Sequence, residues 1–176
     1  MSSSLVVGVD SSLTATGLCE LSDDLEVVLS TVGTKAGPGA RHKLGRMRYL
    51  ADDIAQRCVL SNVVMFEGPS FASKGSATRD LAGLWWLVLD RLDELKVTVG
   101  VVPPSVLKKW TTGKGTASKF QVGQHIAKRW PHEPPLNSDN EGDALALASM
   151  GLQRLGLLPW TPTKVQTAQL GEVEWL

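Results

Sequence analysis

The stretch Leu5-Val6-Val7-Gly8-Val9-Asp10 joins an unbroken apolar run to an acidic residue at its end. A short, continuous apolar run of this kind is typical of a strand that is buried on both faces of a sheet. A carboxylate at the tip of such a strand is costly unless a partner compensates for its charge. The stretch therefore predicts a central strand that delivers Asp10 to a functional site.

Three further acidic residues also lie next to apolar stretches of the chain. Glu67 ends a second apolar run, 63–66, and Asp139 and Asp143 lie one helical turn apart before the apolar stretch 144–148. When three or four carboxylates converge, a divalent cation with oxygen ligands is their cheapest partner. The four acidic positions therefore favour a metal-dependent nuclease.

Composition places the chain among ordinary globular proteins. Its 176 residues fit one domain, with a core at about 5–156 and a C-terminal tail at about 157–176. No apolar run approaches the roughly 18 residues of a membrane span, and the first residues lack the basic region of a secretory signal. Cys19 and Cys58 have no CxxC spacing, so we expect reduced core thiols in a cytoplasmic protein.

The formal net charge is zero, but basic residues are grouped. Two long segments, one between Glu26 and Asp52 and one between Glu94 and Glu133, contain no acidic residue. Their basic residues are Lys35, Arg41, Lys43, Arg46 and Arg48 in the first, and Lys96, Lys108, Lys109, Lys114, Lys119, Lys128 and Arg129 in the second. A basic rim around an acidic centre suits a phosphodiester substrate that is bound through its phosphates. Two solvated helix faces are the alternative explanation.

The order of expected elements indicates the fold class. Strands are expected at 5–11, 14–21, 25–34, 63–67 and 97–102, and helices at 41–60, 78–95, 105–110, 118–130 and 139–155. An antiparallel meander that continues into parallel strands predicts an α/β ribonuclease H-like fold, with a five-stranded mixed sheet and helices on both faces. Because sites form at the carboxyl ends of parallel strands, Asp10 and Glu67 should share one edge.

Four motifs, in order, resemble the RuvC family of Holliday junction resolvases over about residues 5–156. They read VGVDSSLTATG (7–17), FEG (66–68), VPPSVLKK (102–109) with TGKGTASKFQV (112–122), and DALALA (143–148). The short, divergent sequence is more similar to the bacteriophage branch than to the bacterial enzyme. The resemblance implies a homodimer that nicks four-way DNA junctions with two Mg²⁺ ions per active site, for which Mn²⁺ would substitute.

Two-metal phosphodiester hydrolysis fits these acidic residues independently. Asp10 is the candidate to bridge both ions, Glu67 to hold one ion and orient the attacking water, and Asp143 to complete the site. The family places an acid or a histidine three residues before the last aspartate, where this chain has Asn140. We favour Asp139 as the replacement ligand because i and i+4 share a helix face, and Asn140 as a neutral ligand next. A helix N-cap role for either residue is the alternative.

Lysines of the third motif are candidates for phosphate contacts. Lys119 matches the lysine of the family motif and could balance negative charge in the transition state; a solvated charge at a helix start is the alternative. Lys108, Lys109 and Lys114 complete this group, and the loop 113–116 could cradle a phosphate with its amides.

Aromatic residues suggest contacts with DNA and with a second subunit. Phe71 lies one residue after the family's stacking aromatic, so it is either a wedge at the junction or a lid over the core; Lys74 and Arg79 are further candidates for DNA binding. Trp85 and Trp86 face different sides of one helix, so one should be core and the other an interface residue. The tail, with its tryptophans, either packs back or contacts the second subunit.

Three other functions share some of these sequence features with a junction resolvase. A nuclease of the same fold could cut flaps, forks or structured RNA. An actin-like or sugar-kinase ATPase shares the strand-Asp motif, but it needs a second phosphate loop and a longer chain. A DNA-binding module without catalysis has no need of the set Asp10, Glu67 and Asp143.

Overall fold

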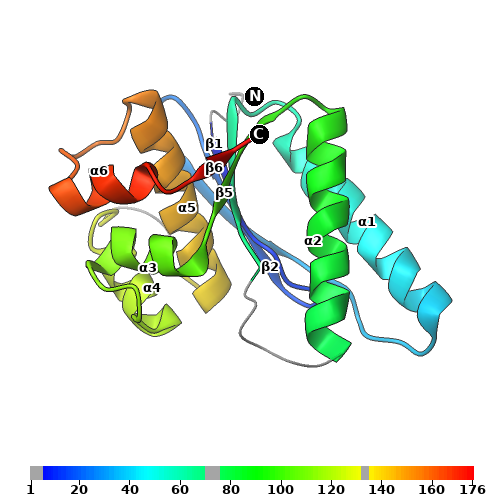
Figure 1. Ribbon diagram of the computed structural model, residues 1–176. Helices are drawn as coiled ribbons and strands as arrows, with labels where there is room; N and C mark the ends of the chain where they lie inside the picture. The colour runs from blue at the N-terminus through cyan, green and yellow to red at the C-terminus, as the bar shows by residue number, and fades with distance from the viewer. Residues whose placement is uncertain (1–5, 70–75, 132–134) are drawn as a thin grey trace.

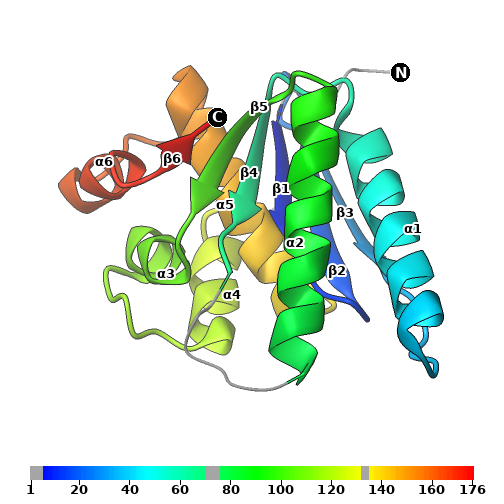
Figure 2. The same cartoon turned by 45° about the vertical axis from the view of Figure 1, so that its right-hand side comes forward.

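The computed structural model describes residues 6–69, 76–131 and 135–176, and it contains a six-stranded mixed sheet with strand order β3-β2-β1-β4-β5-β6 (Figures 1 and 2). β1 (Val6–Asp10), β2 (Thr16–Leu21) and β3 (Val27–Val32) form the expected antiparallel meander. β4 (Val63–Glu67) and β5 (Thr98–Val102) run parallel to β1, and β6 (Glu174–Trp175) pairs antiparallel with β5. The α/β class and the mixed sheet are confirmed.

The strand count differs from the expected five because the C-terminal tail adds β6. A strand of two residues is too short to show any period in the sequence. The rest of the tail also packs back: α6 (Lys164–Leu170) lies against α3 (Pro104–Thr112), and Trp160 contacts Trp110 and Trp130 with ring centroids 6.5 and 5.8 Å apart.

Helices cover both faces of the sheet, as Figures 1 and 2 show. α1 (Ala40–Cys58) and α2 (Ser76–Glu94) lie on one face. The other face carries α3, α4 (Lys119–Ala127), α5 (Asp139–Leu155) and α6. None of the helices in the described part of the chain is long and apolar enough to cross a membrane.

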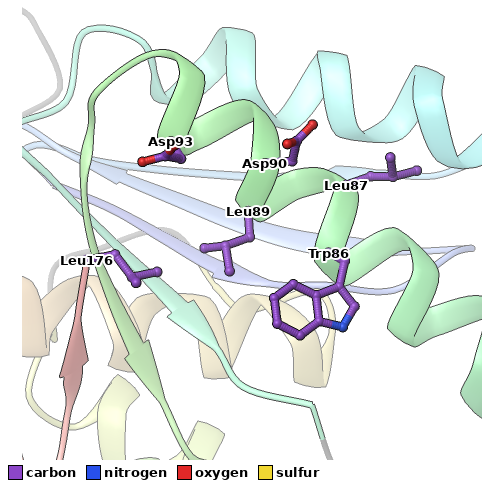
Figure 3. A pocket seen from close by; sticks show the side chains of 6 residues that line it. All are labelled: Trp86, Leu87, Leu89, Asp90, Asp93 and Leu176. Atoms are coloured by element: carbon purple, nitrogen blue, oxygen red, sulfur yellow. The ribbon is translucent and has the colours of Figure 1, made fainter.

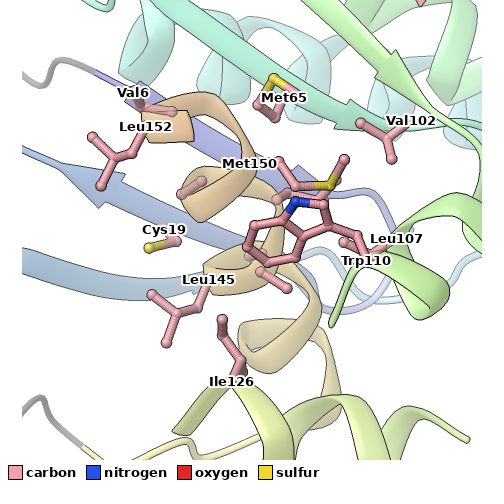
Figure 4. Close-up of a cluster of buried hydrophobic side chains, with 14 of the residues drawn as sticks. Val6, Cys19, Met65, Val102, Leu107, Trp110, Ile126, Leu145, Met150 and Leu152 are labelled. Carbon is pink, nitrogen blue, oxygen red and sulfur yellow. The ribbon is translucent and has the colours of Figure 1, made fainter. Parts of the chain in front are cut away.

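Each face has its own hydrophobic core, and this explains why the strands read as continuous apolar runs. Val6, Cys19 and Met65 face the core around α5, part of which is shown in Figure 4. Alternate residues such as Val7 and Phe66 face α1 and α2. The thiols of Cys19 and Cys58 are therefore buried in opposite cores.

α5 lies unusually close to β1 and β2 because glycines face it. A Cβ atom on Gly8 would lie 2.0 Å from the carbonyl oxygen of Ala144, and one on Gly17 would lie 2.2 Å from that of Asn140. Real Cβ atoms do not approach backbone this closely, so only glycine fits at these two positions. The contact holds the N-terminal end of α5 beside the carboxyl end of β1.

Candidate metal centre

Three carboxylates meet at the carboxyl edge of the sheet. Asp10 is the last residue of β1, and Glu67 is the last residue of the neighbouring parallel strand β4. Asp143 comes from the second turn of α5, which the glycine contacts hold against β1. One oxygen from each side chain lies within 4.8 Å of the others. The structure thus brings together three of the four acidic residues that the sequence singled out.

Burial dominates the electrostatics of this cluster. Asp10 and Asp143 are 4% and 2% exposed. Burial raises the pKa of Glu67 to about 9, and the negative charge of Asp10 and a hydrogen bond with its carboxylate add to the effect. Burial also raises the pKa of Asp143 to about 6, although Lys119 opposes this change. The protein itself does not fully compensate the three negative charges. An all-oxygen donor set with excess negative charge suits a hard divalent cation.

Lys119 is the nearest basic residue to these carboxylates in the described structure. Its Nζ lies 2.9 Å from Asp10 Oδ2 and 3.1 Å from Asp143 Oδ2. It also donates a 3.0 Å hydrogen bond to Asn140 Oδ1. Burial would lower the pKa of Lys119, but the charges of Asp10 and Asp143 outweigh it and raise the pKa above its ordinary value. Ser118 caps α4 through a capping box, which fixes where the Lys119 side chain starts.

The structure places Asn140, and not Asp139, beside the carboxylates. Asp139 is exposed and lines a separate surface cavity. Asn140 donates through Nδ2 to the carbonyl oxygen of Ala15 and accepts from Lys119. Ser138 fills the N-cap position that was considered for Asp139 and Asn140. Glu141 is buried elsewhere, where it accepts from the main-chain N–H of Asn137 at 2.7 Å.

Asp10 and Glu67 face a cavity of about 300 Å³ whose lining also includes Lys119, Asn140 and Trp85. The indole N–H of Trp85 donates to the main-chain carbonyl of Glu67, and its ring stacks on Phe66. The sequence predicts Trp85 only as a core or interface residue. Nothing in the sequence around Trp85 indicates that a residue of α2 will contact the end of β4.

Apart from Lys119, the expected DNA-binding residues fall into three groups. Lys109 and Lys114 are exposed at the end of α3 and in the loop after it, and Arg79 is exposed on α2. Lys108 is half-buried, and its charge acts on Asp143. Phe71 and Lys74 lie outside the described residues. The amide of Lys114 already donates to Thr112 Oγ1 at 3.1 Å, which leaves the loop 113–116 fewer amides for a phosphate.

No protein-family model and no curated protein sequence matches the chain. Solved structures with a similar fold include RuvC from Thermus thermophilus, with a TM-score of 0.65 and 22% identity over 90% of this chain and 99% of that chain. They also include T. thermophilus RuvC in complex with a Holliday junction substrate, with a TM-score of 0.65 and 20% identity over 90% and 98% of the two chains. The yeast mitochondrial Holliday junction resolvase Ydc2 matches with a TM-score of 0.59 and 15% identity over 97% of this chain and 82% of that chain. The chain therefore has the fold of the RuvC-like Holliday junction resolvases.

Proposed function

We propose that the protein is a metal-dependent endonuclease that resolves four-way DNA junctions by paired symmetric nicks. The convergence of Asp10, Glu67 and Asp143 at the carboxyl edge of a RuvC-like sheet carries this proposal. The junction complex of T. thermophilus RuvC, a neighbour in fold, supports the choice of substrate.

Asp10, Glu67 and Asp143 would hold Mg²⁺, with Mn²⁺ as a substitute and two ions in the complete site. Bound ions would activate a water molecule, neutralise the phosphate and stabilise the leaving 3′-oxygen. Glu67, which lines the cavity, would orient the attacking water. Lys119 would add a fixed positive charge beside the reacting phosphate.

Exposed basic residues beside the site would hold the DNA backbone. Lys109 and Lys114 lie at the end of α3 and in the loop that leads to Lys119. Contacts of this kind position a duplex without reading its sequence. Arg79 on α2, together with Phe71 and Lys74 in the segment before it, would contact further parts of the junction.

A second copy of the chain would dock on an apolar pocket beside α2. Its lining includes Trp86, Leu89 and Leu176, with Asp90 and Asp93 also at the pocket (Figure 3). Trp86 is 64% exposed, while its neighbour Trp85 is buried. Two symmetric cuts across a four-way junction require two sites related by a two-fold axis, which a homodimer provides. We place this homodimer in the cytoplasm, the host cytoplasm if a phage encodes it, because its buried thiols suit a reducing compartment.

A nicking assay on a synthetic mobile four-way junction tests the proposal. The reaction contains Mg²⁺ or Mn²⁺, and a linear duplex and a flap of the same sequence are run beside it. Paired symmetric nicks in the junction alone, lost in Glu67→Gln, are the expected result. Equal cutting of the flap and the junction would point to a general nuclease for branched DNA. A protein that cuts no substrate in the presence of metal would overturn the proposal.

A further inference from the structure

We propose that Lys119 stands in for one of the two cations, so that the free protein binds a single divalent ion tightly and the second ion binds only together with a DNA phosphate. The inference rests on the proposed function, because it concerns how the same site is filled. Asn140 is the residue that sets this behaviour, through its contact with Lys119.

The first argument is the match between the Lys119 ammonium and its surroundings. An ammonium group has three N–H donors and no acceptor. Three oxygens surround it at 2.9, 3.1 and 3.0 Å, one each from Asp10, Asp143 and Asn140. Oxygens in such an arrangement are also what a hard divalent cation takes as ligands. Lys119 therefore competes with a cation for Asp10 and Asp143.

The second argument is a charge count. Once a bound cation has displaced the proton that Glu67 holds in the free protein, the side chains of Asp10, Glu67 and Asp143 contribute three negative charges, and Lys119 contributes one positive charge. One divalent ion neutralises the remaining two. A second ion would leave an excess of two positive charges in a largely buried site, which is costly without a further anion. The phosphate of bound DNA supplies such an anion.

The third argument is that Asn140 is fixed in place and uncharged. Its Nδ2 donates to the carbonyl oxygen of Ala15, and the close approach of Gly17 fixes its backbone. Its Oδ1 is therefore held toward Lys119. A carboxylate at this position would add a fourth negative charge and, with two ions bound, would reduce the excess from two positive charges to one without DNA. Asn140 thus acts as a positioning residue for the Lys119 ammonium.

Isothermal titration with Mn²⁺, in the absence of DNA, tests the inference by counting ions. The wild-type protein should bind one Mn²⁺ per protomer. Lys119→Met, which keeps the length of the side chain and removes its charge, should bind two, and Asn140→Asp should also bind two. In both variants, the affinity of the second ion should rise at least tenfold above the wild-type value. Lys164→Met removes an exposed lysine on α6 and should leave the count at one. Thermal unfolding of each variant shows that it is folded.

Two tightly bound ions in the wild-type protein would overturn the inference, and so would a count of one in both Lys119→Met and Asn140→Asp. These outcomes are separate from those of the nicking assay. If the protein nicks the junction and also binds two ions in the absence of DNA, only this inference fails. If the protein binds one ion and cuts no DNA, only the proposed function fails. If it binds no Mn²⁺, both the inference and the proposed function fail.

Discussion

The indole N–H of Trp85 donates a 2.9 Å hydrogen bond to the main-chain carbonyl oxygen of Glu67. The same indole ring stacks on Phe66 with a centroid distance of 5.4 Å and an interplanar angle of 12°. A residue in the middle of α2 thereby fixes the last two residues of β4. The position of the Glu67 carboxylate thus depends on a helix that contributes no charge to the site.

Replacing Trp85 by phenylalanine should therefore weaken the metal site. Trp85→Phe keeps an aromatic ring against Phe66 but loses the hydrogen bond, which is worth about 1 kcal/mol of unfolding free energy. We expect Mn²⁺ affinity to fall several-fold in isothermal titration. Trp130→Phe is the matched control, because the Trp130 indole donates to Ser149 in the core around α5. An equal loss of Mn²⁺ affinity in both variants would contradict the role given to Trp85.

The raised pKa of Glu67 predicts how metal-free stability changes with pH. Its pKa is about 9 in the folded protein and 4.5 ordinarily, so the folded state holds this proton more strongly. The corresponding stability is fully present below pH 4.5 and is lost as the pH rises toward 9. In the presence of a chelator, Glu67→Gln should therefore exceed the wild-type unfolding free energy by an amount that grows with pH. We expect a difference on the order of 1–3 kcal/mol at pH 8 by urea unfolding.

Glu172→Gln, which changes an exposed carboxylate, is the control and should show no such trend. Adding Mg²⁺ at pH 8 should reverse the order of wild-type and Glu67→Gln stability, because only the wild-type site is complete. A constant difference between the two proteins from pH 5 to pH 9 would contradict the assignment.

The contact between α5 and β1 should be intolerant of any side chain. Gly8→Ala would place a methyl group 2.0 Å from the carbonyl oxygen of Ala144, and we expect a loss of roughly 2–4 kcal/mol in unfolding free energy. Gly45 lies in α1, where nothing is within 4 Å of an added Cβ. Gly45→Ala should therefore stabilise the protein by up to about 1 kcal/mol. Equal effects of the two substitutions on thermal unfolding would show that the contact does not matter.

Trp86 should be needed for association of two chains. Trp86→Glu places a charge in the apolar pocket beside α2, so sedimentation velocity should show a shift from dimer to monomer. Leu60→Glu changes a side chain that is 70% exposed and should leave the dimer intact. A monomeric wild-type protein at all concentrations would reject this interface.

The exposed lysines after α3 should contribute to DNA affinity through phosphates. Each of Lys109→Ala and Lys114→Ala should weaken junction binding and reduce the slope of log K against log salt by about 1. Mn²⁺ binding should be unchanged, since neither side chain lines the cavity. Lys164→Ala, an exposed lysine on α6, is the control. A salt slope that is unaffected in the two test variants would place the DNA elsewhere.

Much of the fold could be predicted because both faces of the sheet are buried. The runs before Asp10 and Glu67 are continuous; the observed β4 ends at Glu67 as expected, and β1 ends at Asp10, one residue before the end of the strand expected at 5–11. The parallel pairing of these strands then brings the two carboxylates to one edge. The positions of these two carboxylates could therefore be predicted from the strand ends and the order of the strands alone.

The choice between Asp139 and Asn140 could not be made in the same way. Positions i+3 and i+4 both share a helix face with the starting residue, so spacing alone does not separate them. The rotation of α5 is set by its packing on Gly8 and Gly17, which involves residues more than 100 positions away. The strand β6 was not predicted for a similar reason: these two residues form a strand only because they pair with β5, which lies far away in the sequence.

The glycine contacts under α5 also determine how quickly the site can respond. A helix seated on the backbone of β1 and β2 has little room to slide or rotate as a unit, so the backbone of Asp143 and Asn140 should move together with the sheet. Any rearrangement on cation entry is left to the side chains of Glu67 and Lys119. Rotations of side chains take picoseconds to nanoseconds, whereas helix shifts take microseconds or longer. The rate of metal loading should therefore follow the exchange of water around the incoming ion, and not a conformational step of the protein.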